Sequence, residues 1–197
     1  MIEKLAITFG SLMKAQEMVL LLQGKKRVVR QGFYPHELVN VSKYCKENGI
    51  YMVKSPFKVL LADEGTGLFS NRGIRIAEKD KRPGMYFVYF SKNEEKVWLA
   101  SYYETMQDHK GLGKVLGYPS CCVDFFCNSF NSRNVNLQHN PTNPWTNLSK
   151  RAKDAVLLSH FPCSSDCNES VNLARGYAHA LSLVDKVYTR KLLEKLG

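Results

Sequence analysis

Two short segments that each combine a proline with cysteines constrain the fold of this chain more than any other feature. The first reads Gly117-Tyr118-Pro119-Ser120-Cys121-Cys122, and the second reads His160-Phe161-Pro162-Cys163-Ser164-Ser165-Asp166-Cys167. Each segment is followed by a helical pattern. A helix N-terminus lowers the pKa of a nearby thiol and favours the thiolate, the form that attacks or binds metal. A fold that brings the two helix starts together would therefore create a chemical site.

The spacing of these thiols favours a metal site. Cys163 and Cys167 are four residues apart, so on the last expected helix one turn separates them and both can face one point. Cys121 and Cys122 are adjacent, and adjacent residues of a helix diverge by about 100°, so a single ion would normally take one of them. We therefore predict Cys122, Cys163 and Cys167 as metal ligands, with Cys121 or His160 as the fourth.

The pattern leaves two metals open. Zinc binds four tetrahedral ligands, and three cysteines with one histidine are an accepted structural set. The chain offers Cys-Cys and Cys-x₃-Cys, however, and lacks the Cys-x₂-Cys spacing typical of zinc sites. An iron–sulfur cluster is larger, tolerates irregular spacing and benefits from helix N-termini that offset its negative charge. We rank an iron–sulfur cluster above zinc.

A second interpretation needs no metal. A thiolate enzyme for sulfur transfer or thiol exchange would use Cys122 as nucleophile and Cys163 or Cys121 as the resolving thiol. Glu104 and His109 precede the first cysteine segment and, with Cys121, are candidate catalytic residues, because an acid and an imidazole near a thiol can act as base and orienting group. The alternative for Glu104 and His109 is an exposed, polar helix start.

The cysteines can also be structural. Free cysteine is among the most buried residue types, and Cys45 and Cys127 are expected to be small core residues. A disulfide between the two segments is a further alternative. In a reducing cytosol, clustered thiols more often bind metal or act in catalysis than form disulfides.

Composition indicates an ordinary globular protein. The chain has 197 residues, of which 44% are hydrophobic and 23% charged, and is long enough to bury a core. We predict a single domain over 1–197. No apolar run approaches the roughly 20 residues needed to cross a bilayer, and residues 1–5 lack the layout of a secretory signal. We therefore expect a cytoplasmic protein with no membrane partner.

The net charge of +10 favours an anionic partner. A basic surface suits RNA or another polyanion, whereas the simpler interpretation is solvated lysine on an ordinary surface. A nucleic-acid-binding module in which the cysteines are purely structural is thus a third candidate function. The basic clusters are Lys25, Lys26, Arg27 and Arg30; Lys79, Lys81 and Arg82; and Lys186, Arg190, Lys191 and Lys195.

Hydrophobic periodicity predicts an α+β fold in three parts. N-terminal helices occupy 1–49, a small antiparallel sheet of three to five strands occupies 50–104, and a helical half with the cysteine site occupies 105–197. The aromatic runs at 85–90 and 96–103 indicate a hairpin. The other expected elements are helices over 3–23 and 35–48, strands over 50–53 and 57–61, a strand or loop near 74–76, a helix ending near 117, a helix from 119, a long loop over 128–147, a helix over 148–159, and a last helix from about 164 to 195.

The two cysteine segments also resemble a known family. The phrases Leu116-Gly117-Tyr118-Pro119-Ser120-Cys121-Cys122-Val123-Asp124-Phe125-Phe126 and His160 to Cys167 are similar to the signature of an uncharacterised, mainly archaeal family, domain of unknown function 483. The resemblance covers about residues 105–185. It implies a cytoplasmic archaeal setting and singles out the same cysteines, but it brings no established activity.

Overall fold

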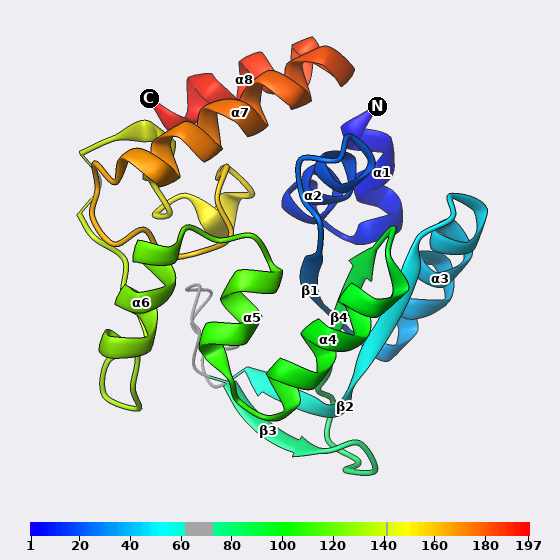
Figure 1. Cartoon of the computed structure of the whole chain (residues 1–197). Helices are drawn as coiled ribbons and strands as arrows, with labels where there is room; N and C mark the ends of the chain where they lie inside the picture. Colours follow the sequence, from blue (N-terminus) through cyan, green and yellow to red (C-terminus); the bar gives the residue numbers. More distant parts are fainter. Residues whose placement is uncertain (62–72, 141) are drawn as a thin grey trace.

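The structure is a computed structural model that describes residues 1–61, 73–140 and 142–197 (Figure 1). It confirms the predicted α+β fold, with N-terminal helices, a small antiparallel sheet and a helical C-terminal half that carries a cysteine group. That the chain forms a single domain stays a prediction. The elements are α1 (Ile2–Phe9), α2 (Leu12–Leu22), β1 (Val29–Phe33), α3 (Leu38–Glu47), β2 (Tyr51–Leu61), β3 (Gly73–Ala77), β4 (Met85–Ser91), α4 (Glu94–Thr105), α5 (His109–Val115), α6 (Ser120–Ser129), α7 (Asn168–Val184) and α8 (Lys186–Leu196), with 3₁₀ turns η1 (Pro35–Glu37), η2 (Pro144–Thr146) and η3 (Arg151–Lys153).

The first expected helix is two helices. Gly10 ends α1 with φ +80°, a left-handed conformation that glycine adopts without strain, and the Ser11 side chain then caps α2 by accepting from the Lys14 N–H at 3.1 Å. The two helices meet at 112°. Among the described residues, no single helix is both long and apolar enough to cross a membrane. The bent pair α1 and α2 passes that test together, by length and composition.

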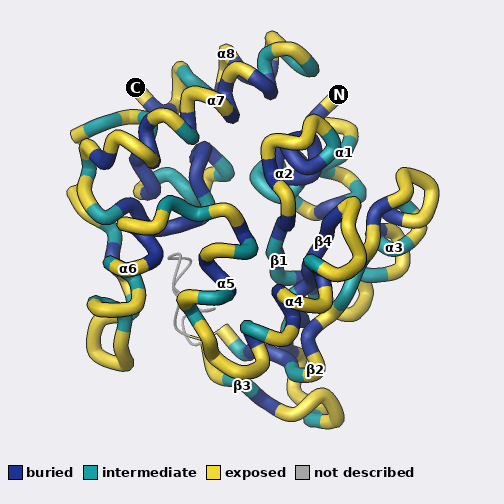
Figure 2. Tube along the Cα trace, in the orientation of Figure 1, coloured by how far each residue is buried: buried dark blue, intermediate teal, exposed yellow. Residues whose placement is uncertain are grey.

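The sheet has the order β1-β4-β2-β3, and all of its pairs are antiparallel. β2 is one strand rather than the expected two, because the chain absorbs Pro56 in a register shift between Lys54 and Lys58. Side chains of β4 alternate between two cores, with Val88 and Phe90 facing α1–α3 and Tyr89 facing α4 and α5. The central strand β4 is therefore covered on both faces, and Figure 2 draws most of it as buried.

The predicted strand at 96–103 is wrong, because this segment forms α4. Asn93 caps the helix by accepting from the Lys96 N–H at 3.0 Å. The residues that α4 buries are three or four apart, the period of a helix, while its aromatic Trp98 is 59% exposed. The aromatic content that suggested a strand therefore lies partly on the solvent face. The buried residues of α4 are Val97, Ala100, Ser101 and Glu104.

The C-terminal half contains less helix than predicted. The expected last helix begins only at Asn168 and breaks at Asp185, whose carboxylate caps α8 and binds the N-terminal ammonium at 2.6 Å. The helix predicted over 148–159 is absent apart from η3, because residues 155–158 run as buried, irregular chain into the hydrophobic core. Residues 128–147 are mostly irregular, as expected, apart from the end of α6 and η2.

Candidate metal centre

Four cysteines from both predicted segments meet at one point of the C-terminal half. Cys121 and Cys122 lie in the first turn of α6, Cys167 is the N-cap of α7, and Cys163 lies in the connection before it. The four Sγ atoms all lie within 4.8 Å of one another. Four thiols this close form a group that could hold a metal ion.

Three of the four sulfur atoms are nearly equidistant. Sγ of Cys121 lies 3.8 Å from that of Cys122 and 3.7 Å from that of Cys167, and the sulfurs of Cys122 and Cys167 are 3.6 Å apart. Cys122 and Cys167 are buried, Cys163 is half-buried and Cys121 is exposed. The group thus has a buried side and one side that reaches the surface.

Local sequence explains how the chain reaches this arrangement. Gly117 closes α5 with φ +77°, and Pro119 then starts α6 with the thiols in its first turn. The second segment makes a tight turn in which the Cys167 N–H donates to the Ser164 carbonyl at 3.3 Å. Two helix N-termini therefore converge on the sulfurs, and their dipoles favour thiolates.

The pKa values of the thiols diverge. Burial opposes ionisation of Cys167, but hydrogen bonds with Ser170 and with the thiols of Cys163 and Cys122 together outweigh it and lower the pKa of Cys167 to about 7. Burial raises the pKa of Cys163 to about 11 and that of Cys122 well above its usual range. Without a cation, Cys167 ionises more readily near neutral pH than Cys122 or Cys163.

The structure answers which residue joins the three predicted thiols. Cys121 lies in the group, whereas His160 lies behind it, with Nε2 2.9 Å from Ser170 Oγ. Of the two residues predicted as the possible fourth member, the structure brings Cys121 into the group beside Cys122, although adjacent residues of a helix diverge by about 100°. Cys163 is not on a helix, so the one-turn argument for its pairing with Cys167 is wrong even though the two thiols do meet.

Sequence reasoning missed Ser170. Its hydroxyl lies 3.2 Å from Cys122 Sγ, and its side chain is wholly buried beside the group. The signal was its place three residues after Cys167, on the same side of the first turn of α7. The two remaining cysteines differ from each other: Cys45 is buried, as predicted, while Cys127 is exposed, contrary to its prediction.

Glu104 and His109 stand outside the cysteine group. Glu104 is buried and accepts from Arg30 Nε at 2.5 Å and from Arg75 at 3.0 Å. Although burial favours its neutral form, these arginines hold the pKa of Glu104 below its usual range. The ring of His109 packs edge-on against Phe126 at 5.4 Å. Glu104 is thus an ion-paired carboxylate inside the protein, not the exposed residue of a polar helix start.

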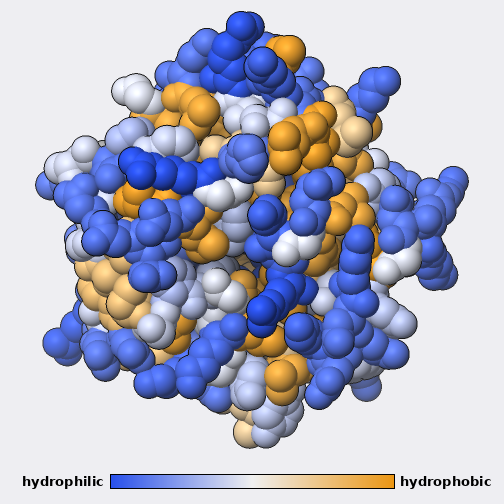
Figure 3. All heavy atoms as spheres, turned by 45° about the horizontal axis from the view of Figure 1, so that its top comes forward, coloured by the Kyte–Doolittle hydropathy of each residue, from blue (hydrophilic) through white to orange (hydrophobic). Residues whose placement is uncertain are grey.

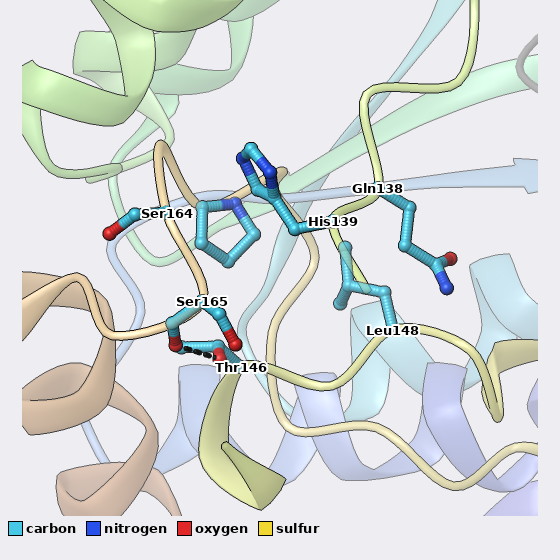
Figure 4. A pocket seen from close by; sticks show the side chains of 7 residues that line it. Gln138, His139, Thr146, Leu148, Ser164 and Ser165 are labelled. Carbon is cyan, nitrogen blue, oxygen red and sulfur yellow. Dashed lines mark hydrogen bonds between the residues drawn. The ribbon is translucent and has the colours of Figure 1, made fainter. Parts of the chain in front are cut away.

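A small pocket borders the second cysteine segment (Figure 4). Residues of the 138–148 loop line one side of it, and residues 162–165 line the other. Thr146 Oγ1 donates to the Ser165 carbonyl at 2.5 Å, and the Thr142 hydroxyl lies 2.6 Å from Ser165 Oγ. These hydrogen bonds from the irregular loop therefore stabilise the turn that carries Cys163 and Cys167.

The first basic cluster is divided between the interior and the surface. Lys26 is buried and pairs with Glu17, and its ammonium donates to Ser159 Oγ at 2.7 Å, while Arg30 binds Glu104. Lys25 and Arg27 remain exposed. On the face shown in Figure 3, hydrophilic side chains surround several separate hydrophobic patches. Binding to RNA or another polyanion stays a prediction, and this cluster offers it fewer free charges than expected.

Comparison with known proteins confirms the predicted resemblance. Residues 95–191 match the family described as "Protein of unknown function (DUF483)". The matched part begins in α4 and contains all four cysteines of the group, while the whole sheet lies outside it. No curated protein and no solved structure matches the chain.

Proposed function

We propose that Cys121, Cys122, Cys163 and Cys167 bind one metal ion as four thiolates and that this ion holds the two halves of the C-terminal site together. The supporting observation is the spacing of the sulfurs. Three Sγ pairs are 3.6 to 3.8 Å apart. A tetrahedral zinc ion with zinc–sulfur bonds of about 2.3 Å requires sulfurs about 3.8 Å apart.

The same spacing makes zinc our first choice, ahead of the iron–sulfur cluster that the sequence pattern favoured. A cluster distributes its cysteines over several irons, so thiolates bound to different irons stand farther apart than thiolates that share one ion. Four protein ligands also complete a tetrahedral shell, the arrangement of structural zinc sites, whereas catalytic zinc keeps an open position. The proposal is therefore a structural, metal-stabilised unit.

Charge considerations support this assignment. Four thiolates around a divalent ion carry a net charge of −2, which the converging N-termini of α6 and α7 offset in part. The N–H of Cys163 donates to Cys122 Sγ at 3.3 Å, and the Ser170 hydroxyl contacts the same sulfur. Hydrogen-bond donors around a thiolate are what a buried metal–sulfur site requires.

Elemental analysis of protein purified without oxygen, with its visible absorption spectrum, tests the proposal. We expect a colourless protein with one zinc per chain, and a thiol titration that finds four cysteines protected until a chelator is added. A brown protein with iron and acid-labile sulfide would restore the cluster to first place. A metal-free protein whose unfolded chain titrates with six free thiols would overturn the metal site altogether.

A second candidate, a metal-free thiolate enzyme, has one observation in its favour. The pKa of Cys167 is lowered to about 7, and its sulfur lies 3.7 Å from exposed Cys121. The nucleophile would then be Cys167 rather than Cys122, because the pKa of Cys122 is raised. Alkylation at pH 7 without chelator, followed by peptide mapping, tests this candidate. Rapid labelling of Cys167 supports the enzyme, and labelling only after chelation supports the metal site.

A further inference from the structure

A buried hydroxyl and a buried imidazole stand in line behind the cysteine group. Ser170, in the first turn of α7, has no exposed surface, and its Oγ lies 3.2 Å from Cys122 Sγ and 2.9 Å from His160 Nε2. His160 is only 7% exposed. The two side chains therefore form a short chain that ends on a proposed metal ligand.

The direction of these hydrogen bonds follows from the proposed metal site, on which this inference rests. A metal-bound thiolate has no proton, so Cys122 can only accept. Ser170 has one hydroxyl proton, which then goes to the thiolate, and its oxygen is left to accept from His160. The imidazole must therefore carry a proton on Nε2.

We propose that Ser170 and His160 are positioning residues that set the affinity of the four-cysteine site for its metal. Ser170 donates to the thiolate of Cys122, and His160 holds the hydroxyl in that orientation. Together with the N–H of Cys163, the pair gives Cys122 two donors. Partners of this kind behind metal ligands typically change metal affinity 10- to 100-fold.

The surroundings of His160 keep it in this role. Its ring packs against Tyr118 with the centroids 4.9 Å apart, and the Tyr118 hydroxyl lies 3.3 Å from Ser159 Oγ. Burial, and then the charges of Lys26 and Arg151, lower the pKa of His160 to about 3. A second proton is thus disfavoured and the ring is neutral. Its single proton must then lie on Nε2, because a bare Nε2 would accept the hydroxyl proton in place of the sulfur.

Zinc affinity of full-length variants, measured by competition with a chromophoric chelator, tests the proposal. We expect Ser170→Ala and His160→Phe each to bind zinc at least about tenfold more weakly, and the double variant to lose no more than either alone, because the two act as one unit. His160→Gln retains an N–H donor and should recover part of the loss. Cys127→Ser is the matched control, since Cys127 is exposed on α6 outside the group.

A spectroscopic readout separates positioning from mere packing. Nitrogen-15 NMR of the zinc-loaded protein should show His160 protonated on Nε2. Wild-type affinity in Ser170→Ala, or a proton on Nδ1 of His160 in the zinc-loaded protein, would overturn the proposal. If wild type binds no zinc at all, the metal site itself fails. If wild type binds zinc and the variants bind it equally well, only the role of Ser170 and His160 fails.

Discussion

The four-cysteine group and the ion pairs of Glu104 are both polar clusters in a folded interior, but they are neutralised in different ways. Glu104 meets two guanidinium groups, those of Arg30 from β1 and Arg75 from β3. The sulfurs of the cysteine group contact one another, a hydroxyl and a backbone N–H. One cluster contains its own counter-charges, and the other gathers thiols whose ionised form needs a cation.

This difference suggests two ways of joining distant parts of a chain. The carboxylate ties α4 to two strands of the sheet, using charges that the sequence supplies. The thiols tie the start of α6 to the start of α7, across about forty residues that include the long irregular loop. Irregular chain forms few backbone hydrogen-bond ladders of its own, so under the proposed function this is the part of the fold that a bound ion would stabilise most.

The largest expected effect is therefore the loss of one thiol. Cys163→Ser should release the metal and unfold the C-terminal half. Structural zinc sites supply about 10 kcal/mol of apparent binding free energy, which is comparable with the whole stability of a domain. Metal content and thermal melting measure the effect, and hydrogen exchange locates it. Cys163 is half-buried, so its replacement disturbs packing less than that of Cys122.

Cys127→Ser is the control for this prediction, because it removes an exposed thiol from the same helix as Cys121 and Cys122. It should retain the metal and the wild-type melting temperature. A Cys163→Ser protein with full metal content and an unchanged melting temperature would contradict the assignment of Cys163 as a ligand. The cysteine group and the Glu104 cluster would then no longer differ in this respect.

Glu104→Gln should have a smaller effect that does not depend on metal. The substitution leaves two arginines facing a neutral amide, and removing one partner of a buried ion pair costs about 3 kcal/mol. We take the lower end of the usual range because Arg30 and Arg75 keep 29% and 31% of their side-chain surface exposed. Urea unfolding at saturating zinc measures the change.

Glu78→Gln is the matched control, because Glu78 pairs with Lys54 at the surface, where ion pairs contribute little. It should leave the unfolding midpoint nearly unchanged. Zinc affinity should be unaffected in both variants. A fall in zinc affinity in Glu104→Gln would show that the two clusters are coupled rather than independent.

How far the sequence predicts this structure also differs between the two regions. Proline and paired thiols mark the cysteine segments, and the meeting of Cys122, Cys163 and Cys167 could be predicted from them. The sequence leaves the fourth member open between Cys121 and His160, because adjacent helix residues diverge by about 100°, yet the sulfurs of Cys121 and Cys122 lie 3.8 Å apart. Whether Cys121 belongs to the group thus depends on side-chain geometry that the helix period does not determine.

The elements around Glu104 are much harder to predict from the sequence. β1 was not predicted, since Arg30 and Gln31 give it little strand character and its partner β4 lies more than fifty residues away. The aromatic residues of the α4 segment predict a strand there, whereas the structure has a helix. The ion pairs of Glu104 with Arg30 and Arg75 depend on β1, on α4 and on the strand order of the sheet. No local sequence pattern therefore predicts them.

The smallest expected effect is a pH dependence that belongs to Glu104. Burial alone would raise its pKa, but Arg30 and Arg75 more than compensate and hold it below the usual 4.5. A carboxylate with a lowered pKa in the folded state stabilises the protein above pH 4.5 and loses that contribution as the pH falls through the folded-state value. The difference in free energy of unfolding between wild type and Glu104→Gln should thus be constant from pH 7 to about 5 and shrink below pH 4.5.

Both proteins carry the same cysteines, so acid release of the metal affects them alike and cancels in the comparison. A difference that stays constant down to pH 3 would mean that Glu104 contributes through shape and hydrogen bonding rather than through its charge.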